Sequence, residues 1–356
     1  MNHVTDLHQR RISRRRVLQG AAALGGTALA GMLLSACSSS APGRRGLKSV
    51  KLTQAVDSLA YAQNYIARAK GYYAEQGLAV ETIVTDGGGP DVQAVLAGSA
   101  MFTINDGAQV LTSFKQDRKL TAVAAMFDKC LVNATISTKA AKRAGITEGS
   151  SHAKRVEALR GLRIGVTAPG ALTWQIARYN LRNAGIDPDK DAELVALGGG
   201  TAVVAALEND QVDAVYISIP FGEAAVARGN AITLIDHSSG EDPKLQKFMM
   251  EGLWVTPETM EKDSGTVQAM VAALTKASEF LRKSSEEEVV ETLRSDFPKF
   301  PPKVLKTAAG MLKSALPADH RWDDEGVETT ISVLKENKLL PASVSTKDRI
   351  FEDRYI

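Results

Sequence analysis

Hydrophobic and polar positions of the chain alternate between short strand-like runs and helical spacings. In the first cycle of this pattern, four apolar runs of strand length are separated by helix-like or glycine-rich segments. These runs lie at residues 50–55, 78–84, 101–104 and 120–126, and a further extended run covers 131–137. Because apolar runs of this length bounded by turn residues are typical of strands, the first cycle predicts a sheet.

A second cycle of the same kind begins at residue 162. Its strand-like runs lie at 163–166, 194–197, 214–217 and 232–235, with a last one at 253–256. From residue 265 onward the apolar positions follow helical spacing to the end of the chain. Strands that alternate with helices of this length predict an α/β fold, with mostly parallel sheets built from βαβ units.

Two runs of three glycines, 111 residues apart, follow a strand-like segment in each cycle, at 87–89 and 198–200. Each run leads into a helical apolar period, so it places unpaired backbone N–H groups at the start of a helix. Such a helix start favours a negative or strongly dipolar group. One run in each half therefore predicts a ligand held between two lobes, although glycines can also serve turn geometry alone.

The first 36 residues have the pattern of an export signal. Five arginines, among them Arg14 and Arg15, precede an apolar stretch that is too short and too rich in glycine to span a membrane. The segment 13–18 resembles a twin-arginine signal, and an ordinary secretory signal remains open. The sequence Leu-Ser-Ala-Cys at 34–37 resembles the lipobox of bacterial lipoproteins, which implies lipidation of Cys37. Residues 37–46 then form a tether.

The net charge and the cysteine content of the chain restrict the kinds of partner and of covalent bond that we expect. The whole chain has a formal charge of +2, but residues 1–36 hold five basic residues and one acidic residue, so the remaining 320 residues carry −2. Nucleic acid is therefore excluded as a favoured partner. After Cys37 the only cysteine is Cys130, which we expect to be a buried small hydrophobe.

Three phrases of the sequence resemble one protein family. Residues 71–81 read GYYAEQGLAVE, residues 159–166 read LRGLRIGV, and residues 211–214 read QVDA. Together with the first glycine run they are similar to the solute-binding proteins of taurine, alkanesulfonate and nitrate ABC importers. The wider family also includes binders of thiamine pyrimidines. The resemblance covers roughly residues 50–350.

The resemblance implies a type II periplasmic-binding-protein fold, with two α/β lobes joined by a hinge and a cleft between them. Lobe 1 would comprise 47–128 plus 250–356, and lobe 2 would comprise 129–249. It further implies a monomeric, extracytoplasmic protein that binds a small solute and docks on an ABC permease with its ATPase. Lipid on Cys37 would hold it at the membrane.

Ligands of open α/β sheets bind beyond the carboxyl ends of the strands, so the loops after each strand hold the candidate site residues. These are Ser58, Tyr61, Gly88, Gly89, Asn105 and Gly107 in lobe 1, and Thr167, Gly170, Thr173, Gly200, Thr201 and Ser218 in lobe 2. Their hydroxyl and N–H groups can bind an anion such as a sulfonate, nitrate or carboxylate. Tyr61 and Trp174 are candidates for an apolar wall or for plain core packing, and the threonines can equally begin helices.

Acidic residues in the same loops favour a different ligand. Asp57, Asp86, Asp91 and Asp106 would repel an anion but would suit the amino group of a pyrimidine or a similar amine-bearing aromatic. The alternative interpretation is that these side chains cap helices and face water. The sequence leaves the charge of the solute open.

The sequence gives no catalytic, metal or cofactor motif after the signal. The wider family includes a thiamine-pyrimidine synthase, which relies on cysteines and histidines. Here the remaining histidines, His152, His237 and His320, lie far apart in sequence without metal-ligand spacing. We therefore expect a binding protein with no catalytic residues, no metal and no cofactor. An enzyme of that synthase type, or a ligand sensor, is the alternative.

Overall fold

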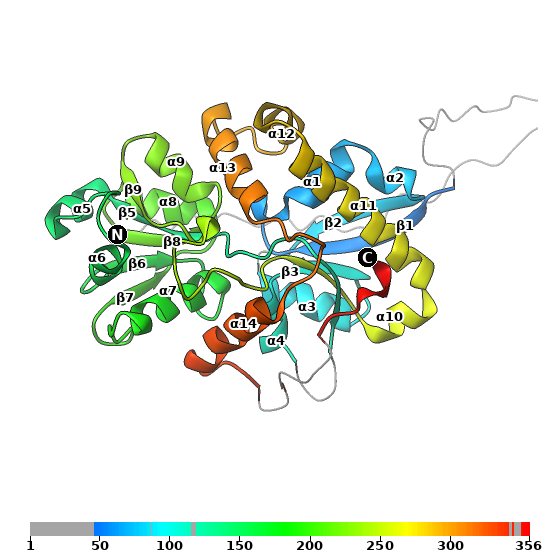
Figure 1. Ribbon diagram of the computed structural model, residues 1–356, viewed down its shortest axis with the longest axis horizontal. Helices are drawn as coiled ribbons and strands as arrows, with labels where there is room; N and C mark the ends of the chain where they lie inside the picture. Colours follow the sequence, from blue (N-terminus) through cyan, green and yellow to red (C-terminus); the bar gives the residue numbers. More distant parts are fainter. Residues whose placement is uncertain (1–45, 86, 115–118, 342–343, 345–349) are drawn as a thin grey trace, which may run out of the picture. The chain divides into compact units, whose positions relative to one another are not determined.

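The computed structural model describes residues 46–85, 87–114, 119–341, 344 and 350–356 (Figure 1). The expected signal with Arg14 and Arg15, the lipidation residue Cys37 and Asp86 lie outside the described residues. Within these ranges strands and helices alternate, as the hydrophobic pattern predicts. None of the helices in the described chain has the length and apolar character that crossing a membrane requires.

The first sheet combines four strands of the early chain with one from its later part. Its order is β2-β1-β3-β10-β4. β1 pairs in parallel with β2 and β3, whereas β10 runs antiparallel to both β3 and β4. The described strands of this sheet are β1 (Lys48–Gln54), β2 (Leu78–Val84), β3 (Phe102–Asn105), β4 (Thr121–Ala125) and β10 (Gly252–Val255).

The second sheet repeats this design with the order β7-β6-β8-β5-β9. Here β5 is the strand that runs antiparallel to its neighbours, β8 and β9. The described strands are β5 (Val132–Ser137), β6 (Arg163–Val166), β7 (Glu193–Ala196), β8 (Ala214–Ser218) and β9 (Ala231–Ile235). The expectation of mostly parallel sheets therefore holds for strand direction, while one reversed strand makes each described sheet mixed.

Helices follow most of the strands and pack against the sheets, with α3 on β3 and α7, α8 and α9 on β8. The longest described helix, α11, buries Val267, Met270 and Leu274 at the predicted spacing. The helices are α1 (Ala62–Ala69), α2 (Tyr72–Glu75), α3 (Gly88–Leu96), α4 (Gly107–Thr112), α5 (Thr138–Ala144), α6 (His152–Glu157), α7 (Leu172–Asn183), α8 (Gly200–Glu208), α9 (Phe221–Ala227), α10 (Pro257–Lys262), α11 (Ser264–Lys283), α12 (Glu286–Leu293), α13 (Pro302–Ser314) and α14 (Asp324–Glu336), with 3₁₀ turns η1 (Leu59–Tyr61), η2 (His237–Ser239) and η3 (Asp353–Tyr355).

Two segments cross between the sheets, one from β4 to β5 and one from β9 to β10. They are hydrogen-bonded to each other: the N–H groups of Met126 and Phe127 donate to the Glu251 carbonyl oxygen at 2.8 and 3.1 Å, and Phe248 N–H donates to the Asp128 carbonyl at 2.9 Å. These bonds fix the backbone of Glu251 at the end of the first sheet. A hinge in these crossings stays a prediction.

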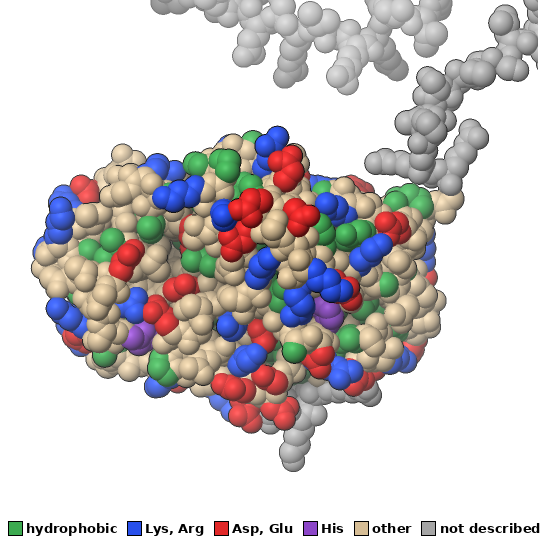
Figure 2. Space-filling view, turned by 45° about the horizontal axis from the view of Figure 1, so that its top comes forward, with side chains coloured by type: hydrophobic (Ala, Val, Ile, Leu, Met, Phe, Trp, Pro, Cys, Tyr) green, Lys and Arg blue, Asp and Glu red, His purple; other side chains and the backbone are tan. Residues whose placement is uncertain are grey.

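The face of the molecule in Figure 2 mixes Lys and Arg with Asp and Glu side chains. Basic side chains are scattered among acidic ones on this face, some of the acidic ones lie in groups, and a broad basic field of the kind that binds nucleic acid is not seen there.

Candidate ligand-binding site

A cavity of about 340 Å³ lies at the carboxyl ends of strands from both sheets. From the first sheet its wall takes the residues that follow β1, β2 and β3, and from the second sheet those that follow β6, β7 and β8. The wall also includes Met250 and Glu251 of the later crossing segment. This is the position that the carboxyl-end rule predicts for a ligand.

Both glycine-started helices open onto this cavity. Gly87 is the N-cap of α3 and Gly199 is the N-cap of α8, neither has a side chain that caps the helix, and both line the wall. The wall also contains Gly198. Two uncapped helix starts at one cavity offer backbone N–H groups and a favourable dipole to an anionic or polar group.

The glycines that the sequence predicts for the site are next in sequence to the glycines of the wall, but their surroundings differ. Gly88 and Gly200 are the first residues of α3 and α8. A Cβ on Gly200 would come within 2.6 Å of the Phe221 ring, whereas a Cβ on Gly89 would meet only Gln109 at 3.8 Å. Gly200 is thus required for helix packing, because a side chain there would displace Phe221.

Five other predicted residues are brought together on the wall: Tyr61, Asn105, Thr167, Thr173 and Ser218. Thr167 and Thr173 are linked by their hydroxyl groups at 2.8 Å, and Thr167 N–H donates to the Thr173 hydroxyl at 3.1 Å. Thr173 therefore ties the loop after β6 to the first turn of α7. Tyr61 is buried and lies on the wall at the same time.

The remaining predicted residues lie beside the cavity. Ser58 is fully buried, and its hydroxyl donates to the Ile219 carbonyl at 2.8 Å, which joins a loop of the first sheet to one of the second. Gly107 permits close contact, because a Cβ there would lie 2.6 Å from Met249. Gly170 has a φ of +79°, which a turn requires and glycine adopts readily. Trp174 packs under the Arg178 guanidinium.

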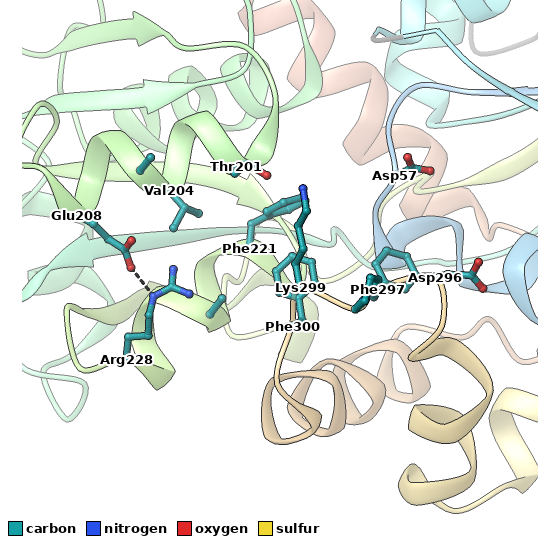
Figure 3. A pocket seen from close by; sticks show the side chains of 13 residues that line it. Asp57, Thr201, Val204, Glu208, Phe221, Arg228, Asp296, Phe297, Lys299 and Phe300 are labelled. Atoms are coloured by element: carbon teal, nitrogen blue, oxygen red, sulfur yellow. Dashed lines mark hydrogen bonds and ion pairs between the residues drawn. The ribbon is translucent and has the colours of Figure 1, made fainter.

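Thr201 lies on a second and larger cavity of about 530 Å³, shown in Figure 3. Phe221, Phe297 and Phe300 contribute to its wall. Several of its charged groups are paired: Arg228 pairs with Glu208 at 2.6 Å and Asp296 pairs with Arg68. We place the solute in the smaller cavity, because its wall holds both helix starts and a carboxylate without a complete set of partners.

Three acidic residues, Asp91, Asp106 and Glu251, lie at or behind that wall, and burial raises the pKa of each. The pKa of Asp91 rises to about 7 mainly through burial, opposed by a hydrogen bond from Thr85. Burial also raises the pKa of Asp106 and, together with repulsion from Asp106 and Asp91, that of Glu251. Glu251 was not among the residues that the sequence predicts for the site.

The interpretation that these aspartates cap helices and face water holds only in part: Asp106 caps a helix but is buried, Asp57 faces water, and Asp91 is buried. Asp106 caps α4 by accepting a hydrogen bond from Gln109 N–H, but its exposed fraction is 6%. Asp91 is fully buried. Asp57 is exposed and accepts a hydrogen bond from the Tyr65 hydroxyl at 2.7 Å. The acidity of the cavity is thus an internal property of the fold.

Acidification is therefore expected to stabilise the ligand-free protein. The Asp91 carboxyl has a folded pKa of about 7 against 3.8 when unfolded. Its contribution is fully present below the unfolded pKa and is lost as pH rises through the folded one. Between pH 5 and 8 the loss is about 2 to 3 kcal/mol in the free energy of unfolding. Urea unfolding at both pH values measures it.

The variant Asp91→Asn isolates this effect from other titrating groups. His320 acts in the opposite direction, since burial lowers its pKa and acidification then favours unfolding. The difference between the wild type and the variant removes that contribution. A variant whose stability depends on pH as steeply as the wild type would contradict the assignment to Asp91.

The contacts of His152, His237 and Cys130 indicate structural roles. His237 is fully buried, with its ring nitrogens 2.7 Å from the Val132 carbonyl and 2.9 Å from the Asn180 side-chain oxygen. His152 and His237, distant in sequence, both approach Asp242. Burial raises the pKa of the Cys130 thiol to about 12, which keeps it protonated and poorly nucleophilic. Within the described ranges no group of three or more potential ligands is placed to hold a metal ion.

The family model described as NMT1/THI5 like matches residues 59–288. The chain belongs to the NMT1/THI5-like family. Among curated proteins of this kind, it is 20% identical over 264 residues to the putative binding protein YtlA of Bacillus subtilis, covering 74% of this chain and 75% of YtlA. It is 25% identical over 250 residues to the nitrate/nitrite binding protein NrtA of a Nostoc species, covering 65% of this chain and 53% of that protein.

Solved structures of periplasmic binding proteins have the same fold as this chain. The aliphatic sulphonate binding protein SsuA of Escherichia coli superposes with a TM-score of 0.66 at 16% identity, over 86% of this chain and 92% of SsuA. The nitrate-binding protein NrtA of Synechocystis gives 0.67 at 15% identity, over 87% and 86%. The expected periplasmic-binding-protein fold is confirmed.

The same fold also occurs in an enzyme. The desulfurization enzyme DSZB superposes with a TM-score of 0.58 at 18% identity, over 86% of this chain and 97% of the enzyme. The fold therefore does not by itself separate binding from catalysis, and the site must do so.

Proposed function

We propose that this protein is the extracytoplasmic solute-binding component of an ABC importer, which captures one small solute between two lobes and delivers it to a permease with its ATPase. The lobes are residues 47–128 plus 250–356 and residues 129–249, and the protein acts as a monomer without turnover. The observation that carries the proposal is the cavity of about 340 Å³, at which an uncapped helix start from each half meets polar groups of both sheets.

The relatives support this role, since YtlA, NrtA and SsuA are all described as binding proteins. NrtA binds nitrate or nitrite and SsuA binds aliphatic sulphonates, as their names state, which suggests a small anion of the sulfonate, nitrate or carboxylate type whose charge the two helix starts would favour. The acidic wall favours an amine-bearing solute as the second candidate. Either kind of ligand fits the same importer role.

A thermal-shift screen across sulfonates, nitrate, carboxylates and aminopyrimidines tests the proposal. A solute that binds only the folded state adds about 2.7 kcal/mol to its stability at a hundredfold excess over Kd. We expect at least one compound to raise the midpoint of unfolding and to be recovered unchanged. Catalytic conversion of a screened compound would instead support the synthase-like alternative.

Membrane attachment through Cys37 rests on the sequence alone. We expect Cys37→Ala to release the protein from the membrane fraction, because the thiol is the acceptor of the lipid and the chain then keeps no acyl anchor. Fractionation of cells that express either form, followed by immunoblotting, measures the change. A variant that stays as firmly bound as the wild type would rule out lipidation at this residue.

A further inference from the structure

The Glu251 side chain is held at the cavity with part of its binding capacity unused. Its exposed fraction is 3%, and its Oε2 atom has no hydrogen-bond partner among the described residues. The backbone carbonyl of Glu251 accepts the two hydrogen bonds from Met126 and Phe127. These bonds hold the backbone of Glu251, and the residue lines the wall of the cavity.

The groups around the Glu251 carboxylate favour a positively charged partner for it. Burial raises the pKa of Glu251 most, repulsion from Asp106 and Asp91 raises it further, and a hydrogen bond from the Tyr61 hydroxyl only partly offsets these effects. Asp106 and Tyr61 line the cavity with Glu251, while Asp91 lies behind them and also has an oxygen, Oδ2, without a described partner. Within the part of the chain that the structure describes, none of these three carboxylates forms an ion pair.

Buried carboxylates in proteins are normally paired or fully hydrogen-bonded, because loss of hydration costs several kcal/mol that only a partner returns. Here the carboxylate without a partner lies at a cavity that is large enough for a small organic molecule. The carboxylates do not form a group suited to a metal ion in the described part of the chain. An organic cation that enters with the ligand fits both observations.

We propose that Glu251, supported by Asp106, binds a protonated amine or amidinium group of the transported solute. This inference rests on the importer function proposed above and adds the class of ligand. The cation accepts no hydrogen bonds, so it donates to the unused Oε2 atom and to the neighbouring carboxylate. An anionic group elsewhere on the same solute remains compatible with the helix starts at Gly87 and Gly199.

Two pairs of probes that differ in the amine test the inference. The first pair is 3-aminopropanesulfonate and propanesulfonate, and the second is benzamidine and benzoate. In calorimetry we expect the nitrogen-bearing member of at least one pair to bind the wild type at least about tenfold more tightly, which is the size of one charge-assisted contact. The affinity for the nitrogen-bearing probe should increase from pH 5 to pH 8, because the carboxyl groups of Glu251 and Asp106 lose their protons over this range.

The variant Glu251→Gln keeps the shape and removes the charge. It should reduce the preference for the amine to less than about threefold, while the ligand-free protein unfolds at a temperature about 2 to 4 °C higher. Glu223→Gln is the matched control. Glu223 is also buried with an Oε2 atom that has no described partner, but it lies on α9 away from this cavity. This control should leave the preference unchanged.

The outcomes separate the inference from the function on which it rests. Equal or tighter binding of propanesulfonate and benzoate to the wild type would overturn the cation site and leave the importer role in place. An amine preference that Glu251→Gln does not reduce would also overturn it. If no probe binds and the protein purified from its host retains no small molecule, the importer proposal fails and the inference fails with it.

Discussion

Replacing Gly199 by Trp is expected to lower the affinity for the solute by at least about 100-fold with little effect on folding. Gly199 has a φ of −69° and a ψ of 161°, which any residue can adopt, and a Cβ there meets no atom within 4 Å. The added ring would extend into the cavity that Gly199 lines and occupy the space of the solute. Calorimetry with a solute from the screen measures the loss.

Two other glycines provide the controls for this prediction. Gly265 is exposed on α11 and also has open space at its Cβ position, so Gly265→Trp should leave binding unchanged. Gly200→Val should lower the stability of the fold, in contrast to Gly199→Trp. The valine side chain would meet the Phe221 ring and destabilise α8. If Gly199→Trp binds the solute as tightly as Gly265→Trp, the solute lies elsewhere.

Replacing Trp254 by Ala is expected to destabilise the protein by about 3 to 5 kcal/mol, the range for loss of a large buried side chain. Trp254 is fully buried in β10, which pairs with β3 and β4. Its ring centroid lies 5.5 Å from that of Trp322, and its indole N–H donates to the Asn105 carbonyl at 2.8 Å. Urea unfolding measures the change in free energy.

The hydrogen bond to Asn105 links this core residue to the wall of the cavity. Trp254→Phe should cost less than the alanine variant, because most of the ring contact is kept. Trp174→Ala is the control on the same residue type: Trp174 is only half-buried, beneath the Arg178 guanidinium. A Trp254→Ala variant that loses no more stability than Trp174→Ala would show that β10 is not central to the core.

The sequence predicts the strands well because short apolar runs and turn residues are local signals. The run at 78–84 becomes β2 with those bounds, and the run at 163–166 becomes β6. The short helices α5, α6 and α9 were not predicted. They have six or seven residues each, which is too few to display a helical period, and packing on the second sheet stabilises them.

In the glycine runs, the cavity wall lies within about one residue of the predicted positions. The pattern identifies two helix starts but not which glycine is the N-cap. The N-cap is the glycine at which the backbone changes from extended to helical, and a pattern of three glycines does not show where this change occurs. In the structure the wall glycines are Gly87, Gly198 and Gly199, whereas the sequence predicts Gly88, Gly89 and Gly200.

Glu251 could not be predicted from local sequence. It lies in the irregular segment before β10, and its place on the wall depends on hydrogen bonds with residues 126 and 127 of the other crossing. A contact between segments more than 120 residues apart leaves no local periodicity. The acidic residues after β2 and β3 were visible, but their burial was not, because it arises from the packing of both sheets.

Native mass spectrometry of the purified protein shows whether each chain holds a solute in this cavity without converting it. We expect one small molecule bound per chain, whose mass is the same before and after incubation with the protein, and no such molecule on Gly199→Trp. A molecule retained equally by that variant would contradict the placement of the site. Its conversion to a product of different mass would contradict the assignment as a binding protein.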